Sequence, residues 1–266
     1  MRLLLSALLV TVAVLAAGCS SARYNPTAYD YYIDQEALAA TPIKKVVLAS
    51  VNVSGEPTRS MLRDSVAKID AEVTDYLQKN GYVIAPAHIF NNAWQQALLT
   101  YGDFYDPTSG RVDKQGWQQV MAATMKALQG SDVDAIVFTD LIEHEVQHSG
   151  GLNHYARWYG VTREPATEGS SASVAADFNW NQLIKAASLV VTIYTPDGKP
   201  LFTSRGGLDT LYAINSRKSN SSFVRRSKVL SRNQYIEEGV ELAFHPLIVM
   251  DDYPGIPKDQ KDEAQQ

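Results

Sequence analysis

Apolar positions in the first half of the chain recur at two spacings, and each spacing predicts a different element. Residues 45–53 are mostly apolar and β-branched, which predicts a buried strand. A stripe at helical spacing follows and ends at Asn80-Gly81, a typical helix C-terminus. It consists of Leu62, Val66, Ile69, Val73, Tyr76 and Leu77. A short strand is then expected over 82–85, and helices over 92–99 and 114–129.

The second half of the chain has the pattern of strands. Strands are expected over 133–138 and 155–162, and Asp197-Gly198 predicts a hairpin between strands 187–194 and 200–204. A last apolar stripe predicts a helix over 234–244. This order predicts an α+β fold, with helices packed on a mixed, largely antiparallel sheet in a single domain.

The N-terminus has the layout of a secretory signal, with Arg2 before an apolar run over 3–14. Leu15-Ala16-Ala17-Gly18-Cys19 closes that run and resembles the lipobox of bacterial lipoproteins. The resemblance implies cleavage before Cys19, lipidation of its sulfur with a diacylglyceryl group, and palmitate or a similar acyl chain on the new N-terminus. Two or three acyl chains give stable membrane anchoring. The alternative is an ordinary signal peptide in which the cysteine is incidental.

These patterns divide the chain into four segments. We expect a signal peptide over 1–18, a lipidated tether over 19–42, an α+β periplasmic domain over 43–250 and a flexible tail over 251–266. Four tyrosines in this stretch are unusual for a plain linker, namely Tyr24, Tyr29, Tyr31 and Tyr32. We expect them to dock on the domain, and a position at the level of the lipid headgroups is the alternative. By analogy with enteric lipoproteins, Ser20 after the cysteine favours the outer membrane, on its periplasmic face.

The composition narrows the function classes. A hydrophobic content of 45% fits a folded globular chain, and a net charge of −5 gives no reason to expect a nucleic-acid partner. Cys19 is the only cysteine. Its lipidation would exclude a disulfide framework, a thiolate nucleophile and a cysteine-based zinc site. The order of elements over 43–248 also resembles periplasmic lipoproteins of the curli-secretion and penicillin-binding-protein-activator type, which implies a binding or assembly module without catalysis. We expect no cofactor.

One motif points instead to an enzyme. His144, Glu145, His148, Gly151 and His154 complete H-E-x-x-H-x-x-G-x-x-H, which resembles the metzincin zinc-protease signature. The resemblance implies a Zn²⁺ held by the three histidines, with Glu145 as the general base on a metal-bound water. This chemistry needs a helix through His148, because residues four apart share a helix face.

The local pattern favours a strand over that helix. Ile142, His144, Val146 and His148 alternate with polar residues, and a strand would place Glu145 on the opposite face from both histidines. Residues 149–153 then form a hairpin loop, with 155–162 as the returning strand. Asp140 and Glu143 could instead form a capping box and start a helix. A non-catalytic metal site on one strand face is a third interpretation.

A basic segment stands out in this acidic protein. Its members are Arg217, Lys218, Arg225, Arg226, Lys228 and Arg232. Arg225, Arg226 and Lys228 are candidates for contact with anionic headgroups or cell-wall polymer, and a solvated loop is the alternative. We therefore expect an outer-membrane lipoprotein that binds another envelope component, either a protein or the cell wall. A membrane-anchored zinc endopeptidase is the alternative function.

Overall fold

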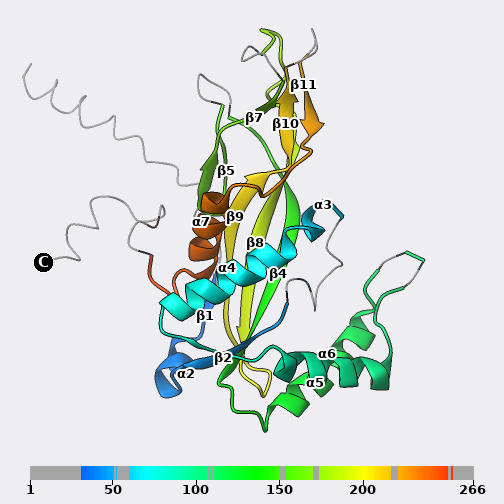
Figure 1. Cartoon of the computed structure of the whole chain (residues 1–266), viewed down its shortest axis with the longest axis vertical. Helices are drawn as coiled ribbons and strands as arrows, with labels where there is room; N and C mark the ends of the chain where they lie inside the picture. Colours follow the sequence, from blue (N-terminus) through cyan, green and yellow to red (C-terminus); the bar gives the residue numbers. More distant parts are fainter. Residues whose placement is uncertain are drawn as a thin grey trace, which may run out of the picture.

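The structure, a computed structural model, describes residues 31–50, 52, 60–106, 108–109, 111–149, 154–169, 174–216, 221–250 and 253. Helices pack on mixed sheets, so the predicted α+β fold is confirmed (Figure 1). The helices are α2 (Gln35–Ala40), α3 (Ser60–Arg63), α4 (Val66–Lys79), α5 (His88–Tyr101), α6 (Lys114–Leu128) and α7 (Asn233–Phe244). Cys19 and the lipobox lie outside the described residues, as do 254–266 of the expected tail.

A six-stranded sheet forms the centre of the molecule. Its order is β1-β9-β8-β4-β2-β3, from β1 (Tyr32–Ile33), β2 (Lys45–Leu48), β3 (Val83–Ala85), β4 (Ala135–Val146), β8 (Ile184–Tyr194) and β9 (Pro200–Thr210). The long strands β4, β8 and β9 pair antiparallel, and β2 pairs parallel with both β3 and β4. The Asp-Gly hairpin that joins β8 to β9 is confirmed.

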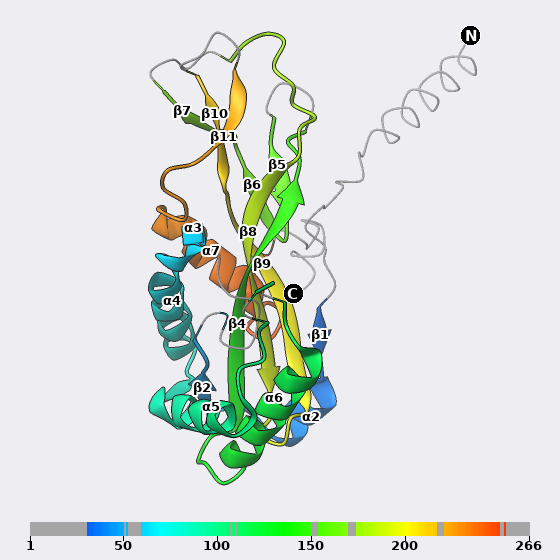
Figure 2. The same ribbon diagram turned by 90° about the vertical axis from the view of Figure 1, so that its right-hand side faces the viewer.

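Alternation along β4 sends its side chains to two separate cores. Val137 and Leu141 belong to the cluster that α4 and α7 cover. Ile136 and Phe138 point to the other face, where α5 and α6 cover them. In Figure 2, α4 and α7 lie on one side of the long strands, and α5 and α6 lie across their lower end. The lower half of the sheet is therefore buried on both faces, which explains the almost continuous apolar run at the start of β4.

Helix α7 approaches β9 closely because glycines face each other. A Cβ on Gly206 would overlap the carbonyl oxygen of Gly239, and a Cβ on Gly239 would lie 2.6 Å from the Gly207 carbonyl oxygen. Val240, Ala243 and Phe244 extend the contact into the core. Only residues without a side chain let the helix backbone come this near to the strand.

The upper end of the molecule carries two small sheets (Figures 1 and 2). One pairs β5 (Ala156–Trp158) with β6 (Val161–Arg163), and the other has the order β11-β10-β7. Its strands are β7 (Ala166–Glu168), β10 (Tyr212–Asn215) and β11 (Ser222–Arg225).

The prediction of one returning strand over 155–162 is therefore wrong. Tyr159 and Gly160 both have positive φ and turn the chain back on itself, as two-residue hairpin turns require. The long partner of β4 is β8, with eleven residue pairs from Ile136↔Tyr194 to Val146↔Ile184.

The folded region also begins earlier than residue 43. The backbone of Tyr32 pairs with Thr203 on β9, while the Tyr32 side chain stays 46% exposed. Tyr24 and Tyr29 lie outside the described residues. Asp34 caps α2 by accepting a hydrogen bond from the Ala37 amide (2.8 Å) and forms an ion pair with Lys199 (2.8 Å). Residues 32–40 are thus part of the domain. A two-residue strand is too short to show a period, which is why this stretch resembled a tether.

Among the described residues, no helix has the length and apolar character needed to cross a membrane.

The glycine contact gives a stability prediction. We expect Gly206→Ala to lower the free energy of unfolding by about 3 kcal/mol, because the new methyl group must push α7 away from β9. Gly130→Ala is the control, since no atom lies within 4 Å of its added Cβ. Urea denaturation measures both variants. Equal midpoints for the two would contradict the close packing.

Candidate functional site

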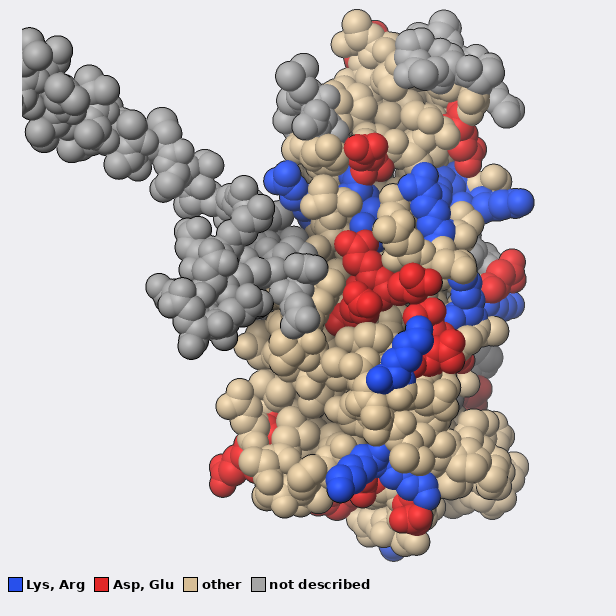
Figure 3. Space-filling view, turned by 60° about the vertical axis from the view of Figure 1, so that its left-hand side comes forward, with Lys and Arg blue, Asp and Glu red and all other residues tan. Residues whose placement is uncertain are grey.

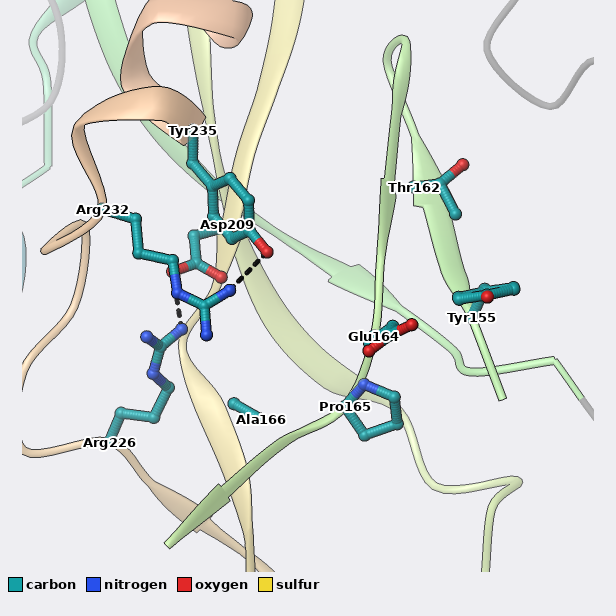
Figure 4. Close-up of a pocket in the computed structure, with 9 residues that line it drawn as sticks. All are labelled: Tyr155, Thr162, Glu164, Pro165, Ala166, Asp209, Arg226, Arg232 and Tyr235. Carbon is teal, nitrogen blue, oxygen red and sulfur yellow. Dashed lines mark hydrogen bonds and ion pairs between the residues drawn. The ribbon is translucent and has the colours of Figure 1, made fainter. Parts of the chain in front are cut away.

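A cavity of about 380 Å³ opens beside the N-terminus of α7. The β5–β6 hairpin and the segment into β7 form one wall, and the end of β9 and the start of α7 form the other (Figure 4). Its lining residues are Tyr155, Thr162, Glu164, Pro165, Ala166, Asp209, Arg226, Arg232 and Tyr235. The volume lies in the lower part of the range for small-molecule sites, about 300–1,000 Å³.

A buried ion pair holds the floor of this cavity. The Arg226 guanidinium contacts the Asp209 carboxylate at 2.7 Å, and their side chains are only 11% and 4% exposed. The same Nη1 donates to the Thr210 carbonyl oxygen at 2.7 Å. Arg226 therefore joins the segment after β11 to the end of β9. It is not the free surface cation that the basic segment predicted, because Asp209 already neutralises it.

A second set of contacts stiffens the α7 wall. The Arg163 guanidinium carbon lies 3.8 Å from the centre of the Tyr235 ring, and Nη2 forms an ion pair with Glu238 at 2.8 Å. The Arg163 Nε donates to the Leu208 carbonyl oxygen at 2.7 Å. On the other side, Arg232 Nη1 donates to the Tyr235 hydroxyl at 2.6 Å. Tyr235 is thus fixed between two arginines before any ligand enters.

Two charges at the cavity remain available. Among the described residues, neither Arg232 nor Glu164 has an oppositely charged partner, and both are exposed. Figure 4 shows them on opposite walls, Arg232 beside Tyr235 and Glu164 beside Pro165. The cavity therefore offers one guanidinium and one carboxylate to a ligand.

The basic segment of the sequence contributes only part of this site. Arg226 and Arg232 line the cavity, whereas Arg225 and Lys228 are exposed and do not. Arg217 and Lys218 lie outside the described residues. No local pattern in the sequence indicates Glu164, Asp209 and Tyr235, because the fold brings them together from distant segments.

The strand interpretation of the histidine motif is confirmed through Val146. β4 runs to that residue, and His148 continues with an isolated antiparallel bridge to Ala156. Glu145 lies on the opposite face from His144 and forms an exposed ion pair with Lys185 at 3.0 Å. The helical face that a metzincin zinc site requires is not formed here. Gly151 lies outside the described residues.

Each histidine has its own surroundings. His144 Nε2 lies 2.7 Å from Ser188 Oγ, which also accepts a hydrogen bond from the Trp158 indole at 3.1 Å. His148 is only 1% exposed and stacks on the Phe223 ring at 5.5 Å. His154 stacks on Trp180 at 3.5 Å. Within the described ranges, no three metal-binding side chains gather around one point.

Burial shifts two pKa values near this strand in opposite directions. It lowers the pKa of His148 to about 4, with a smaller contribution from the charge of His154. It raises the pKa of Asp140, on the same face of β4, to about 6. Both groups are therefore mostly in their neutral forms at pH 5, because the interior penalises charge.

Comparison with known proteins gives little further information. No family model matches the chain, and no curated protein matches it. A crystal structure of lipoprotein GNA1162 from Neisseria meningitidis is similar over 66% of this chain and 87% of that one. Its sequence is 13% identical and the TM-score is 0.31.

The shifted pKa of His148 predicts a loss of stability in acid. The unfolded histidine takes up a proton near pH 6.5, whereas the folded one stays neutral down to about pH 4. Stability from this group is therefore complete above pH 6.5 and declines as the pH falls to 4. We expect it to contribute a loss on the order of 2 kcal/mol between pH 7.5 and pH 5.

The test compares urea denaturation of the wild type and His148→Phe across this window. Asp140 titrates in the same range with the opposite sign, because its folded pKa is raised, and it is present in both proteins. The difference between the two profiles isolates His148. Parallel profiles would show that this histidine does not titrate as its burial predicts.

The strand geometry also predicts the response to zinc. We expect an equimolar addition of Zn²⁺ to leave the melting temperature unchanged, and His148→Ala and Glu145→Gln to leave the zinc content unchanged. Because the Glu145–Lys185 pair is exposed, Glu145→Gln should change stability by less than about 0.5 kcal/mol. Stoichiometric zinc that is lost in His148→Ala would restore the protease interpretation.

Proposed function

We propose that this chain is a bacterial lipoprotein, anchored through Cys19 in the outer membrane and facing the periplasm, whose α+β domain binds another envelope component. The observation that carries the proposal is the lipobox-like sequence ending at the only cysteine. A mature chain of this kind has no need for a membrane-spanning helix, because acyl chains supply the anchor.

The start of the fold supports a short connection to that anchor. Tyr32, where β1 begins, lies thirteen positions after Cys19. Fully extended, this stretch reaches about 45 Å. β1 and α2 lie in the lower part of the molecule, whereas β7, β10 and β11 form its upper end (Figure 1). The anchored end and the cavity end of the domain therefore lie apart, which suits a module that presents its upper end to a partner.

The charge distribution supports a binding role. One face shows a band of Lys and Arg above a cluster of Asp and Glu (Figure 3). On α4 and α7, Glu72 and Glu241 have raised pKa values, first because of burial and then because of repulsion from neighbouring carboxylates such as Glu237. Adjacent belts of opposite charge orient a partner with the complementary pattern.

A zinc endopeptidase is supported only by its sequence motif. His144 and Glu145 point to opposite faces of β4, so the general base would not reach a metal held by the histidines. The preformed cavity, with its walls tied by ion pairs, is better suited to holding a ligand than the strand is to hydrolysis.

The anchor is tested by metabolic labelling with palmitate. We expect the wild type and Ser20→Ala to incorporate label and Cys19→Ala to incorporate none, because the thioether forms on this sulfur. By analogy with enteric lipoproteins, Ser20→Asp should move the labelled protein to the inner-membrane fraction. Equal labelling of the wild type and Cys19→Ala would refute the anchor.

A further inference from the structure

We propose that the cavity beside α7 is a binding site for a zwitterionic ligand, an amino acid or the free end of a short peptide. Arg232 would hold its carboxylate and Glu164 its ammonium group. This inference rests on the proposed binding function of the domain and names the chemistry of its ligand.

The charge balance of the cavity carries the argument. Four charged side chains line it, two arginines and two carboxylates. Arg226 and Asp209 neutralise each other in a buried pair at 2.7 Å, so breaking them apart would leave an uncompensated charge. One cation and one anion remain, on opposite walls. A ligand of no net charge, with a negative end and a positive end, matches this arrangement.

The Arg232 wall has the features of a carboxylate site. Its guanidinium donates to the Tyr235 hydroxyl at 2.6 Å, which limits its rotation. Within the described part of the chain its remaining N–H groups have no acceptor, so they can form charge-assisted hydrogen bonds with a ligand. Arg232 is also the N-cap residue of α7 and provides no side-chain cap. The amides of the first helical turn and the helix dipole therefore add positive potential on this side of the cavity.

The opposite wall selects against a simple anion. Glu164 is exposed at the cavity, and Pro165 follows it in the lining. A phosphate with close to two negative charges would be repelled by this carboxylate, whereas an ammonium group would be attracted. Tyr155 and Thr162 lie on the Glu164 side of the cavity and add hydroxyl groups to that wall (Figure 4). The observations thus favour a zwitterion over a phosphate that has no ammonium group.

Triglycine and two blocked forms provide the test, by calorimetry on the full-length lipoprotein in detergent. We expect saturable binding of triglycine, and at least a tenfold higher Kd both for N-acetyl-triglycine, which lacks the ammonium group, and for triglycinamide, which lacks the carboxylate. Glycine and diglycine, measured alongside, distinguish a free amino acid from a peptide end as the preferred ligand.

Variants assign each end of the ligand to a wall. Arg232→Gln should raise the Kd of triglycine at least tenfold, and Glu164→Gln should do the same. Glu164→Gln should not weaken N-acetyl-triglycine further, because that ligand has no ammonium group to lose. Arg225→Gln, an exposed arginine outside the cavity, should leave every Kd unchanged. Circular dichroism confirms that the variants fold.

Three results would overturn the site. The first is that neither glycine, diglycine nor triglycine binds saturably. The second is that phosphoethanolamine binds more tightly than triglycine. The third is that Arg225→Gln raises the Kd of triglycine as much as Arg232→Gln does. Palmitate labelling and crosslinking in intact envelopes do not involve this cavity, so failure of the site is distinguishable from failure of the proposed lipoprotein function.

Discussion

The ladder between β4 and β8 determines where nearly every other part of this molecule lies. Its eleven residue pairs run without a shift from Ile136↔Tyr194 to Val146↔Ile184. Because side chains alternate along each strand, this register assigns Val137 and Leu141 to one helical layer and Ile136 and Phe138 to the other. A slip of one residue would exchange the two cores. The same register places His144 beside Ser188 and separates it from Glu145.

The cavity exists because the upper end of β9 is tied to its neighbours at several points. The glycines of β9 and α7 bring the middle of the helix, at Gly239, against the strand. Asp209, near the end of β9, then holds Arg226, and Leu208 accepts from Arg163. These contacts fix both walls in the absence of a ligand, so little ordering entropy is lost when a ligand binds.

Local patterns predicted the elements whose signals lie within the elements themselves. The stripes of α4, α6 and α7 and the Asp-Gly turn between β8 and β9 were found because period and turn chemistry are properties of neighbouring residues. The 155–162 segment was assigned incorrectly because its turn, Tyr159-Gly160, interrupts an otherwise strand-like run. The strand and helix over 32–40 were missed because their stability comes from pairing with β9, which is distant in the sequence.

The candidate site was less predictable than the fold. A run of basic residues indicated Arg226 and Arg232, yet nothing near them in the sequence shows that Asp209 neutralises one and leaves the other free. The histidine motif shows the opposite problem. Its spacing fits a helix, but alternation over 142–148 and the pairing with β8 make it a strand. The sequence pattern over so short a window cannot decide between a helix and a strand, whereas the long pairing of β4 with β8 does.

Oxidative crosslinking of paired cysteines across the ladder tests this account most directly. Glu145 and Lys185 are register partners with exposed side chains, so Glu145→Cys with Lys185→Cys brings two thiols within disulfide reach. The account predicts rapid crosslinking of this pair and little for Glu143→Cys with Lys185→Cys, which are two positions out of register. Equal crosslinking of both pairs, or none at 145 and 185, would contradict the strand and return the histidines to a helix.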